Sequence, residues 1–190
     1  MAYTVNYRDT HFDRANLTPI CGEPTYETVH KLWNEVKANA RSVYSHLCGG
    51  THGYLGLVLT AAQYADISTT VFTRPSHTGP LAIPSAATVV QRSTLQDAHI
   101  EDLQVFREVM GVEQALIQQI VATIDATYME DVRDRTTNSI NVSVSALLLH
   151  LQETYGTLMP HKFQKRKTRT RRLFTTRAIP SRAFFRSSTT

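Results

Sequence analysis

Apolar and small residues recur at alternating steps of three and four between residues 25 and 47, which is the spacing of one face of an α-helix. The members of this stripe are Tyr26, Val29, Trp33, Val36, Ala40, Val43 and Leu47. The opposite side carries the polar residues Lys31, Asn34, Glu35, Lys37 and Arg41. Thr25 is suited to cap the amino end of the helix, and Gly49 and Gly50 supply a stop. The pattern therefore predicts an amphipathic helix from about Thr25 to Leu47.

Helix starts and helix breakers alternate in the following segment. Thr60 and Gln63 have the spacing of a capping box, which predicts a short helix to about Ile67. Residues 68–84 contain three prolines and a glycine, so we expect an ordered connection without regular helix. Ser93 and Gln96 repeat the capping-box spacing and predict a helix to about Met110. Its apolar face consists of Leu95, His99, Leu103, Phe106 and Met110.

Two more helices are predicted after Gly111, which we expect to kink or end the preceding helix. A broad apolar stripe marks the first as a core helix, with Leu116, Ile117, Ile120, Val121, Ile124 and Tyr128. Residues 133–141 are polar and turn-like, and Ser143 can cap the second. Its apolar face holds Val144, Leu147, Leu148, Leu151 and Tyr155, and it is closed by Gly156 and Pro160. Because no alternating strand pattern longer than four residues competes, we predict an all-α bundle of five to six helices.

Charge is distributed unequally along the chain. Ten of the 20 Lys and Arg residues, and none of the 16 Asp and Glu residues, fall within residues 161–190. A basic segment without acids is expected to be disordered by itself. The chain is therefore divided into a flexible arm (1–16), a helical domain (17–160) and a basic tail (161–190). The tail mixes bases with aromatic residues, as single-stranded RNA binders do, and its candidate RNA-binding residues are Lys165, Arg166, Lys167, Arg169, Arg171 and Arg172.

Composition narrows the classes of protein that fit. With 190 residues and 42% apolar content, the chain can bury one core or two small helical lobes. It has no apolar run of about 18 residues and no signal-peptide pattern, so we expect a soluble, cytoplasmic protein without a membrane partner. Cys21 and Cys48 form no C-x-x-C pair and have no histidines at zinc-finger spacing, so neither a disulfide framework nor a metal site is expected.

Candidate chemistry is sparse. The GGTHGYLG stretch around His52 lacks the ending of a P-loop, so close packing of backbones is favoured over a phosphate site. His150 and Glu153 share a helix face but have no further ligands, which favours a surface polar pair. The acidic cluster of Glu130, Asp131 and Asp134 is interpreted as a solvated charge run.

No G-x-S-x-G, D-T-G or D-S-G motif is present. We therefore predict no enzyme, no catalytic residue, no cofactor and no small-molecule substrate. An enzyme would require that the segment around His52 line a deep polar pocket together with acidic groups from elsewhere.

Several segments, in this order along the chain, resemble the Gag-like proteins of copia-type LTR retrotransposons of the diatom and oomycete type. They are LTPICGEPTY (17–26), ANARSV (38–43), GGTHGYLGLVLT (49–60), FTRP (72–75) and HTGP (77–80). Further on, ALI (115–117), the pair Thr136 and Thr137, and LQETYG (151–156) are similar to the wider copia pattern. The resemblance spans about residues 12–160. It implies a capsid-like protein that self-associates into particles around RNA, and we expect self-association through exposed helix faces that include residues 144–155.

The chain departs from this family after Pro160, where it lacks the zinc knuckle of three Cys and one His. One hypothesis treats the basic tail as the product of a shifted reading frame, because its permitted codons read one base over can encode an acidic continuation. The other treats the tail as an RNA-binding arm. A different class of function is also open, in which the chain is a cellular adaptor that binds nucleic acid through the tail and a protein partner through the helical domain.

Overall fold

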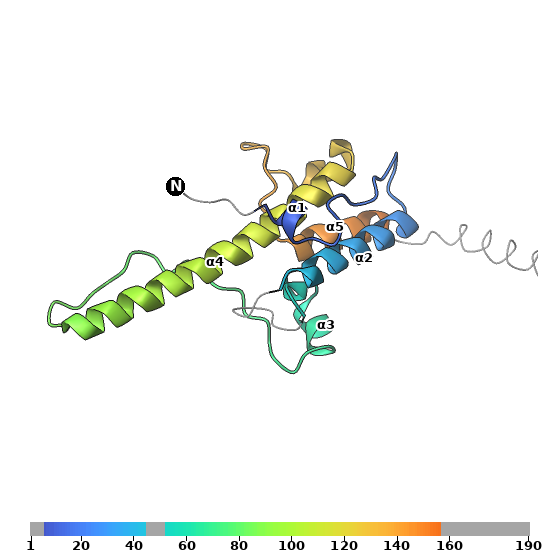
Figure 1. Ribbon diagram of the computed structural model, residues 1–190. Coiled ribbons are helices and arrows are strands. Elements are labelled where there is room, and N and C mark those ends of the chain that lie inside the picture. Colours follow the sequence, from blue (N-terminus) through green and yellow to red (C-terminus); the bar gives the residue numbers. More distant parts are fainter. Residues whose placement is uncertain (1–5, 45–51, 157–190) are drawn as a thin grey trace, which may run out of the picture. The chain divides into compact units, whose positions relative to one another are not determined.

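A computed structural model describes residues 6–44 and 52–156. Figure 1 shows the order of its elements, which are α1 (Tyr7–Thr10), α2 (Tyr26–Ser42), the 3-10 helix η1 (Leu55–Leu57), α3 (Ala61–Ala65), α4 (Val89–Thr123), the 3-10 helix η2 (Ala126–Val132) and α5 (Val144–Tyr155). Within the described ranges there is no β-strand, and the one isolated bridge joins Arg133 to Ile140. The prediction of an all-α fold is confirmed.

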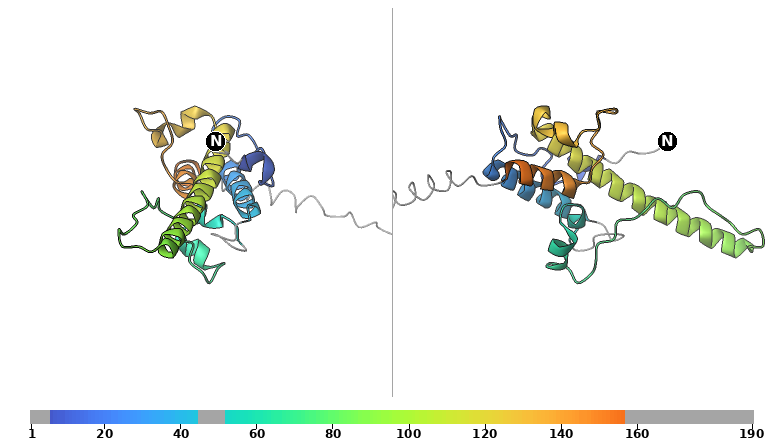
Figure 2. Two further views of the ribbon diagram at one scale, coloured as in Figure 1. Left: turned by 60° about the vertical axis from the view of Figure 1, so that its left-hand side comes forward. Right: turned by 180° about the vertical axis from the view of Figure 1, so that it is seen from behind.

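The hydrophobic core lies where α2, α5 and the carboxyl-terminal half of α4 meet. The right-hand view in Figure 2 shows α2 and α5 side by side. Each helix contributes apolar residues at steps of three and four, so that one face of each helix is removed from water. Side chains with little or no exposed surface include Leu32, Val36, Leu116, Ile120, Leu147, Leu148 and Leu151.

The helix predicted from Thr25 to Leu47 begins where expected but ends earlier. The Thr25 side chain accepts a hydrogen bond from the backbone N–H of Thr28, which completes a capping box. The last helical residue is Ser42, and Val43 is already extended. The chain returns to this end of α2, because the N–H of Tyr54 donates to the Ala40 carbonyl at 2.8 Å. Residues 45–51, which include the predicted stop, lie outside the described residues.

Two of the other predicted helix starts are confirmed and one is wrong. Thr60 caps α3 through a capping box with Gln63, and Ser143 caps α5. However, the cap of α4 is Thr88, which lies five residues before Ser93, forms a capping box with Gln91 and precedes the first helical residue, Val89. It then continues unbroken through Gly111, contrary to the predicted kink or break.

Gly111 has a packing role in place of a breaking one. A Cβ atom at this position would lie 2.8 Å from Cε2 of Tyr7, so the missing side chain leaves room for the tyrosine ring. Beyond Gly111, α4 is mostly buried and ends at Thr123, where Ile124 turns extended. Tyr128, which the apolar pattern placed on the same helix, therefore lies in η2.

Residues 6–16, which the sequence assigned to a flexible arm, contact the helical core. They form α1 and continue into a segment in which Phe12 is buried. The arm reaches α4, since the Gln119 side-chain amide donates to the Arg14 carbonyl at 2.9 Å. The described part of this arm therefore belongs to the same folded unit as α2 and α4.

The connection between α3 and α4 contains no regular helix over residues 68–87, as the prolines predicted. We call this segment the strap. In Figure 1 it runs beside α4 toward the amino end of that helix. The amino-terminal half of α4, residues 89–107, contacts the strap and has no fully buried side chain.

Candidate functional site

The glycine-rich stretch around His52 is a packing element in its described part. Gly53 has a φ of 53°, and a Cβ atom there would lie 2.7 Å from the carbonyl oxygens of Arg41 and Val43. Those oxygens belong to the carboxyl end of α2, whose partial negative charge disfavours an anion. The close backbone approach therefore supports the packing interpretation over a phosphate site.

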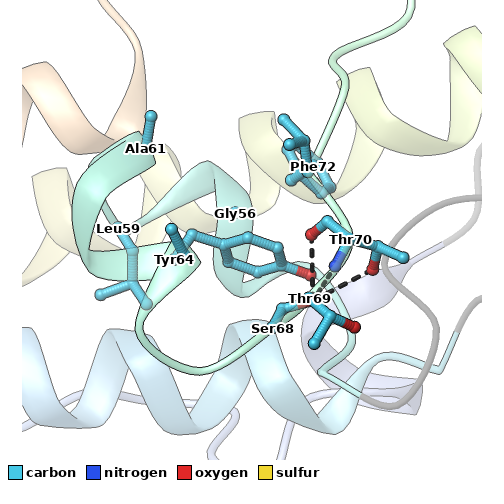
Figure 3. A pocket seen from close by; sticks show the side chains of 10 residues that line it. Gly56, Leu59, Ala61, Tyr64, Ser68, Thr69, Thr70 and Phe72 are labelled. Carbon is cyan, nitrogen blue, oxygen red and sulfur yellow. Dashed lines mark hydrogen bonds between the residues drawn. The ribbon is translucent and has the colours of Figure 1, made fainter.

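A small pocket of about 190 Å³ opens between η1, α3 and the start of the strap (Figure 3). Its described lining consists of Gly56, Leu59, Ala61, Tyr64, Ala65, Ser68, Thr69, Thr70, Val71 and Phe72. The Tyr64 and Phe72 rings meet edge to face, with centroids 5.9 Å apart. The volume is below the roughly 300–1,000 Å³ of ligand sites. Among these residues Tyr64 has the only titratable side chain, so they do not form the polar pocket that an enzyme at His52 would require.

His150 and Glu153 do not form the predicted surface pair. Glu153 is exposed, whereas His150 is half-buried and its Nε2 is enclosed without a hydrogen-bond partner among the described residues. In the parts of the chain that the structure describes, no three His, Cys, Asp or Glu residues are placed to hold a metal ion. The sequence could not reveal the burial of His150, because it depends on how α5 packs in the folded chain.

Asp134, in the predicted acidic cluster, has a structural role in a turn. Its carboxylate accepts hydrogen bonds from the backbone N–H groups of Thr137 and Thr136 at 2.9 and 2.8 Å. These bonds stabilise the ionised form and hold the pKa of Asp134 below its ordinary value. The turn closes at Asn138, whose φ is 55°. Glu130 and Asp131 are exposed, as expected for a solvated charge run.

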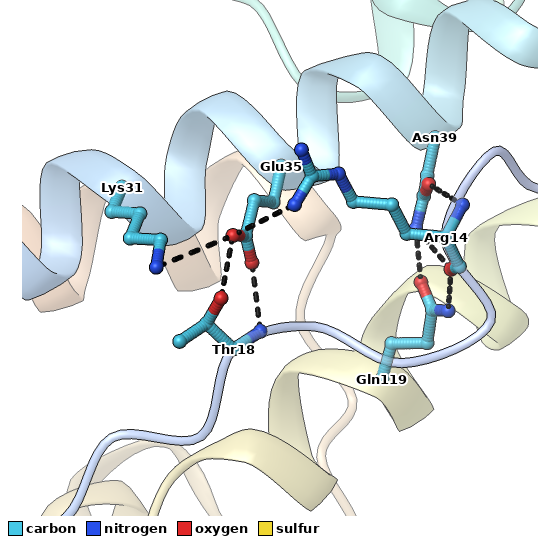
Figure 4. A network of polar contacts seen from close by, with 6 residues as sticks. All are labelled: Arg14, Thr18, Lys31, Glu35, Asn39 and Gln119. Carbon is cyan, nitrogen blue, oxygen red and sulfur yellow. Dashed lines mark hydrogen bonds and ion pairs between the residues drawn. The ribbon is translucent and has the colours of Figure 1, made fainter.

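A buried polar network fastens the amino-terminal segment to α2 and α4 (Figure 4). The Glu35 carboxylate accepts hydrogen bonds from the N–H and hydroxyl of Thr18 at 2.8 and 2.7 Å, and Arg14 lies 3.2 Å from it. Asn39 donates to Gln119 at 2.8 Å, and both amides donate to the Arg14 carbonyl at 2.9 Å. Three segments distant in sequence therefore share one set of hydrogen bonds.

Glu35 is a correction to the helical pattern, which placed it on the polar side of α2. Only 5% of its surface is exposed. Burial acts to raise the pKa of the Glu35 carboxyl, but the hydrogen bonds from Thr18 and the charges of Arg14 and Lys31 lower it below its ordinary value. Because its partner Thr18 lies 17 residues earlier, no local pattern could identify this interaction.

The apolar residues of α5 are buried, whereas several on α4 are exposed, which bears on the surface expected for self-association. The apolar face of α5 packs in the hydrophobic core, since its members are all buried, namely Val144, Leu147, Leu148 and Leu151. This apolar face is therefore not available to a partner, and self-association through the exposed side of residues 144–155 stays a prediction. Large apolar side chains are exposed instead on the amino-terminal half of α4, namely Val89, Val90, Leu95 and Ile100.

The candidate RNA-binding residues of the tail, Lys165, Arg166, Lys167, Arg169, Arg171 and Arg172, lie outside the described residues. Among residues 6–44 and 52–156, no helix combines the length and apolar character needed to cross a membrane. In comparisons with known proteins, no protein family, curated protein or solved structure matches the chain.

Proposed function

We propose that this chain is a structural, Gag-like protein that self-associates into a capsid-like particle and holds RNA through basic residues 165–172. The motifs that resemble copia-type Gag proteins support this proposal, and their described parts lie in an all-α fold. The observation that carries it is the exposure of apolar side chains on the amino-terminal half of α4.

This half of α4 exposes apolar side chains that a soluble domain by itself would favour burying. Val89, Val90 and Ile100 are 84%, 75% and 62% exposed. Val89 and Ile100 are eleven residues apart, which is about three helical turns, so they lie on the same side of the helix. Exposed apolar surface of this kind marks contact surfaces between proteins. A second copy of the chain is the partner that the Gag-like interpretation requires.

Sedimentation velocity of the full chain, measured over a concentration series, tests self-association. We expect species larger than the monomer, in amounts that rise with protein concentration. The double substitution Val89→Ser with Ile100→Ser should shift the equilibrium toward the monomer, because it removes apolar surface from the proposed contact. Val71→Ser is the matched control, since Val71 is equally exposed but lies on the strap. Equal association of both variants and the native chain would remove α4 from the proposal.

RNA binding is tested separately in a variant with glutamine at the six basic residues 165–172. The native chain should bind single-stranded RNA with an affinity that falls steeply as salt rises, and the variant should lose most of this salt dependence. If the chain stays monomeric but binds RNA in this manner, the adaptor function replaces the assembly function. If the chain neither associates nor binds RNA, both proposals are wrong.

A further inference from the structure

The strap follows α4 in the reverse direction through a series of side-chain contacts. Arg74 pairs with Glu113, the His77 ring meets the Phe106 ring edge to face at 5.2 Å, and Thr78 lies 3.3 Å from His99. As residue numbers rise along the strap, they fall along α4. Of the apolar face predicted from the sequence, Leu95 is exposed, whereas His99, Leu103, Phe106 and Met110 are half-buried and lie outside the buried core. The helix-free strap contacts this face at His99 and Phe106.

Chain length limits how far the strap can depart from an extended path. From Val89 to Glu113, α4 advances 24 residues, or about 36 Å. The strap covers the same distance between Arg74 and the Thr88 cap in 14 residues, which reach at most about 50 Å when fully extended. The strap therefore spans about 70% of its maximum reach for as long as Arg74 remains at Glu113.

The Arg74–Glu113 ion pair joins the strap to α4. The Glu113 side chain is 3% exposed, and its Oε1 is enclosed without a hydrogen-bond partner among the described residues. The Arg74 guanidinium pairs with the other oxygen and lies 3.8 Å from the Met110 sulfur. Burial of an unpaired carboxylate is strongly unfavourable, so Glu113 retains Arg74 unless water enters.

The half of α4 that the strap follows has few buried contacts of its own. Residues 89–107 of α4 bury no side chain completely. Most helical stability in proteins comes from the packing of one helix face against other elements. The strap contributes packing to this half of α4 at Phe106 and His99.

We propose that the strap and the amino-terminal half of α4 are one conformational unit, and that the Arg74–Glu113 ion pair is the latch that holds it closed. With the latch in place, residues 89–107 are helical, and the strap partly covers the side of the helix that carries His99, Leu103 and Phe106. When Arg74 leaves Glu113, the strap separates and the helix frays from its amino end toward Val109. This proposal concerns a single chain and stands independently of self-association.

Amide hydrogen exchange of the full chain tests the latch, measured at a protein concentration at which the chain is monomeric. Glu113→Gln keeps the size of the side chain but removes its charge. We expect the amides of residues 93–106 to exchange about tenfold faster, the change expected from losing one charge-assisted hydrogen bond. The amides of residues 112–121 should change much less, because they lie in the core. Glu101→Gln is the matched control, since this exposed carboxylate on the same helix is 12 residues from Glu113.

A second variant separates the latch from a general loss of stability. Arg74→Gln removes the other partner and should accelerate exchange over the same residues 93–106. The two substitutions combined should add little to either one, because both remove the same interaction. Exchange that is unchanged over residues 93–106, or that accelerates equally in residues 112–121, would overturn the latch.

Discussion

The two halves of α4 have different surroundings although they form one unbroken helix. The carboxyl-terminal half buries Val109, Val112, Leu116, Ile117 and Ile120 against α2 and α5. The amino-terminal half buries no side chain completely and instead contacts the strap. Helical periodicity is present in both halves. The comparison shows that an apolar stripe in the sequence predicts a helix, but not what will cover its apolar face.

Because of this difference, substitutions in the two halves of α4 should affect different measured properties. Substitutions in the carboxyl-terminal half should act mainly on the free energy of unfolding, because they remove contacts inside the core. Substitutions in the amino-terminal half should act mainly on contacts with the strap or with another molecule. Matched substitutions in the two halves can therefore test whether the halves differ in this way.

The largest difference is expected between Leu116→Ala and Ile100→Ala. Leu116 is completely buried, so its truncation should lower the free energy of unfolding by about 2–5 kcal/mol. Ile100 is 62% exposed, and its truncation should change the same quantity by less than about 0.5 kcal/mol. Urea denaturation of the monomer measures both values. Equal losses of unfolding free energy would mean that the two halves contribute equally to the stability of the fold.

A smaller loss in the free energy of unfolding is expected from Glu35→Gln, in the polar network that contacts the buried half of α4. The pKa of Glu35 is lower in the folded chain than its ordinary value of 4.5, so its ionised form stabilises the fold at higher pH. This contribution is present above about pH 4.5 and is lost as the pH falls through the lower folded pKa. Glu35→Gln should cost about 1–3 kcal/mol at pH 7, because it replaces hydrogen bonds to a charged acceptor.

Urea midpoints measured from pH 7 to pH 3 check this prediction. The native chain should lose more stability over that range than the Glu35→Gln variant. Parallel pH curves would show that Glu35 does not contribute through its charge.

The smallest effect concerns the start of α4. Thr88→Ala removes the observed amino-terminal cap and should cost about 1 kcal/mol of helix stability. Ser93→Ala, at the start that the sequence predicted, should cost less, because Ser93 lies inside the helix and is exposed. Circular dichroism during thermal unfolding compares the two variants. A greater loss of stability for Ser93→Ala would indicate that the helix is capped at Ser93, as the sequence predicted.

Local signals explain which parts of the fold could be predicted. The caps at Thr25, Thr60 and Ser143 depend on residues within three positions, so they were visible in the sequence. The cap at Thr88 has the same spacing to Gln91, but the apolar stripe begins only at Leu95. The stripe therefore favoured the later candidate, Ser93, and the helix was predicted to start too late.

Long-range polar contacts explain what could not be predicted. Glu35 and Glu113 are both charged residues on helices, and a periodic pattern assigns such residues to the solvent side. Their partners Thr18 and Arg74 lie 17 and 39 residues away, so only the fold brings each pair together. The same limit applies to α5, whose apolar face was visible in the sequence while its burial against α2 was not.

Sedimentation velocity of the purified full chain tests the proposed assembly function most directly. The account predicts species larger than the monomer that grow with protein concentration, and a shift toward the monomer in the Val89→Ser with Ile100→Ser variant but not in Val71→Ser. A single monomeric species at every concentration, with and without single-stranded RNA, would contradict it.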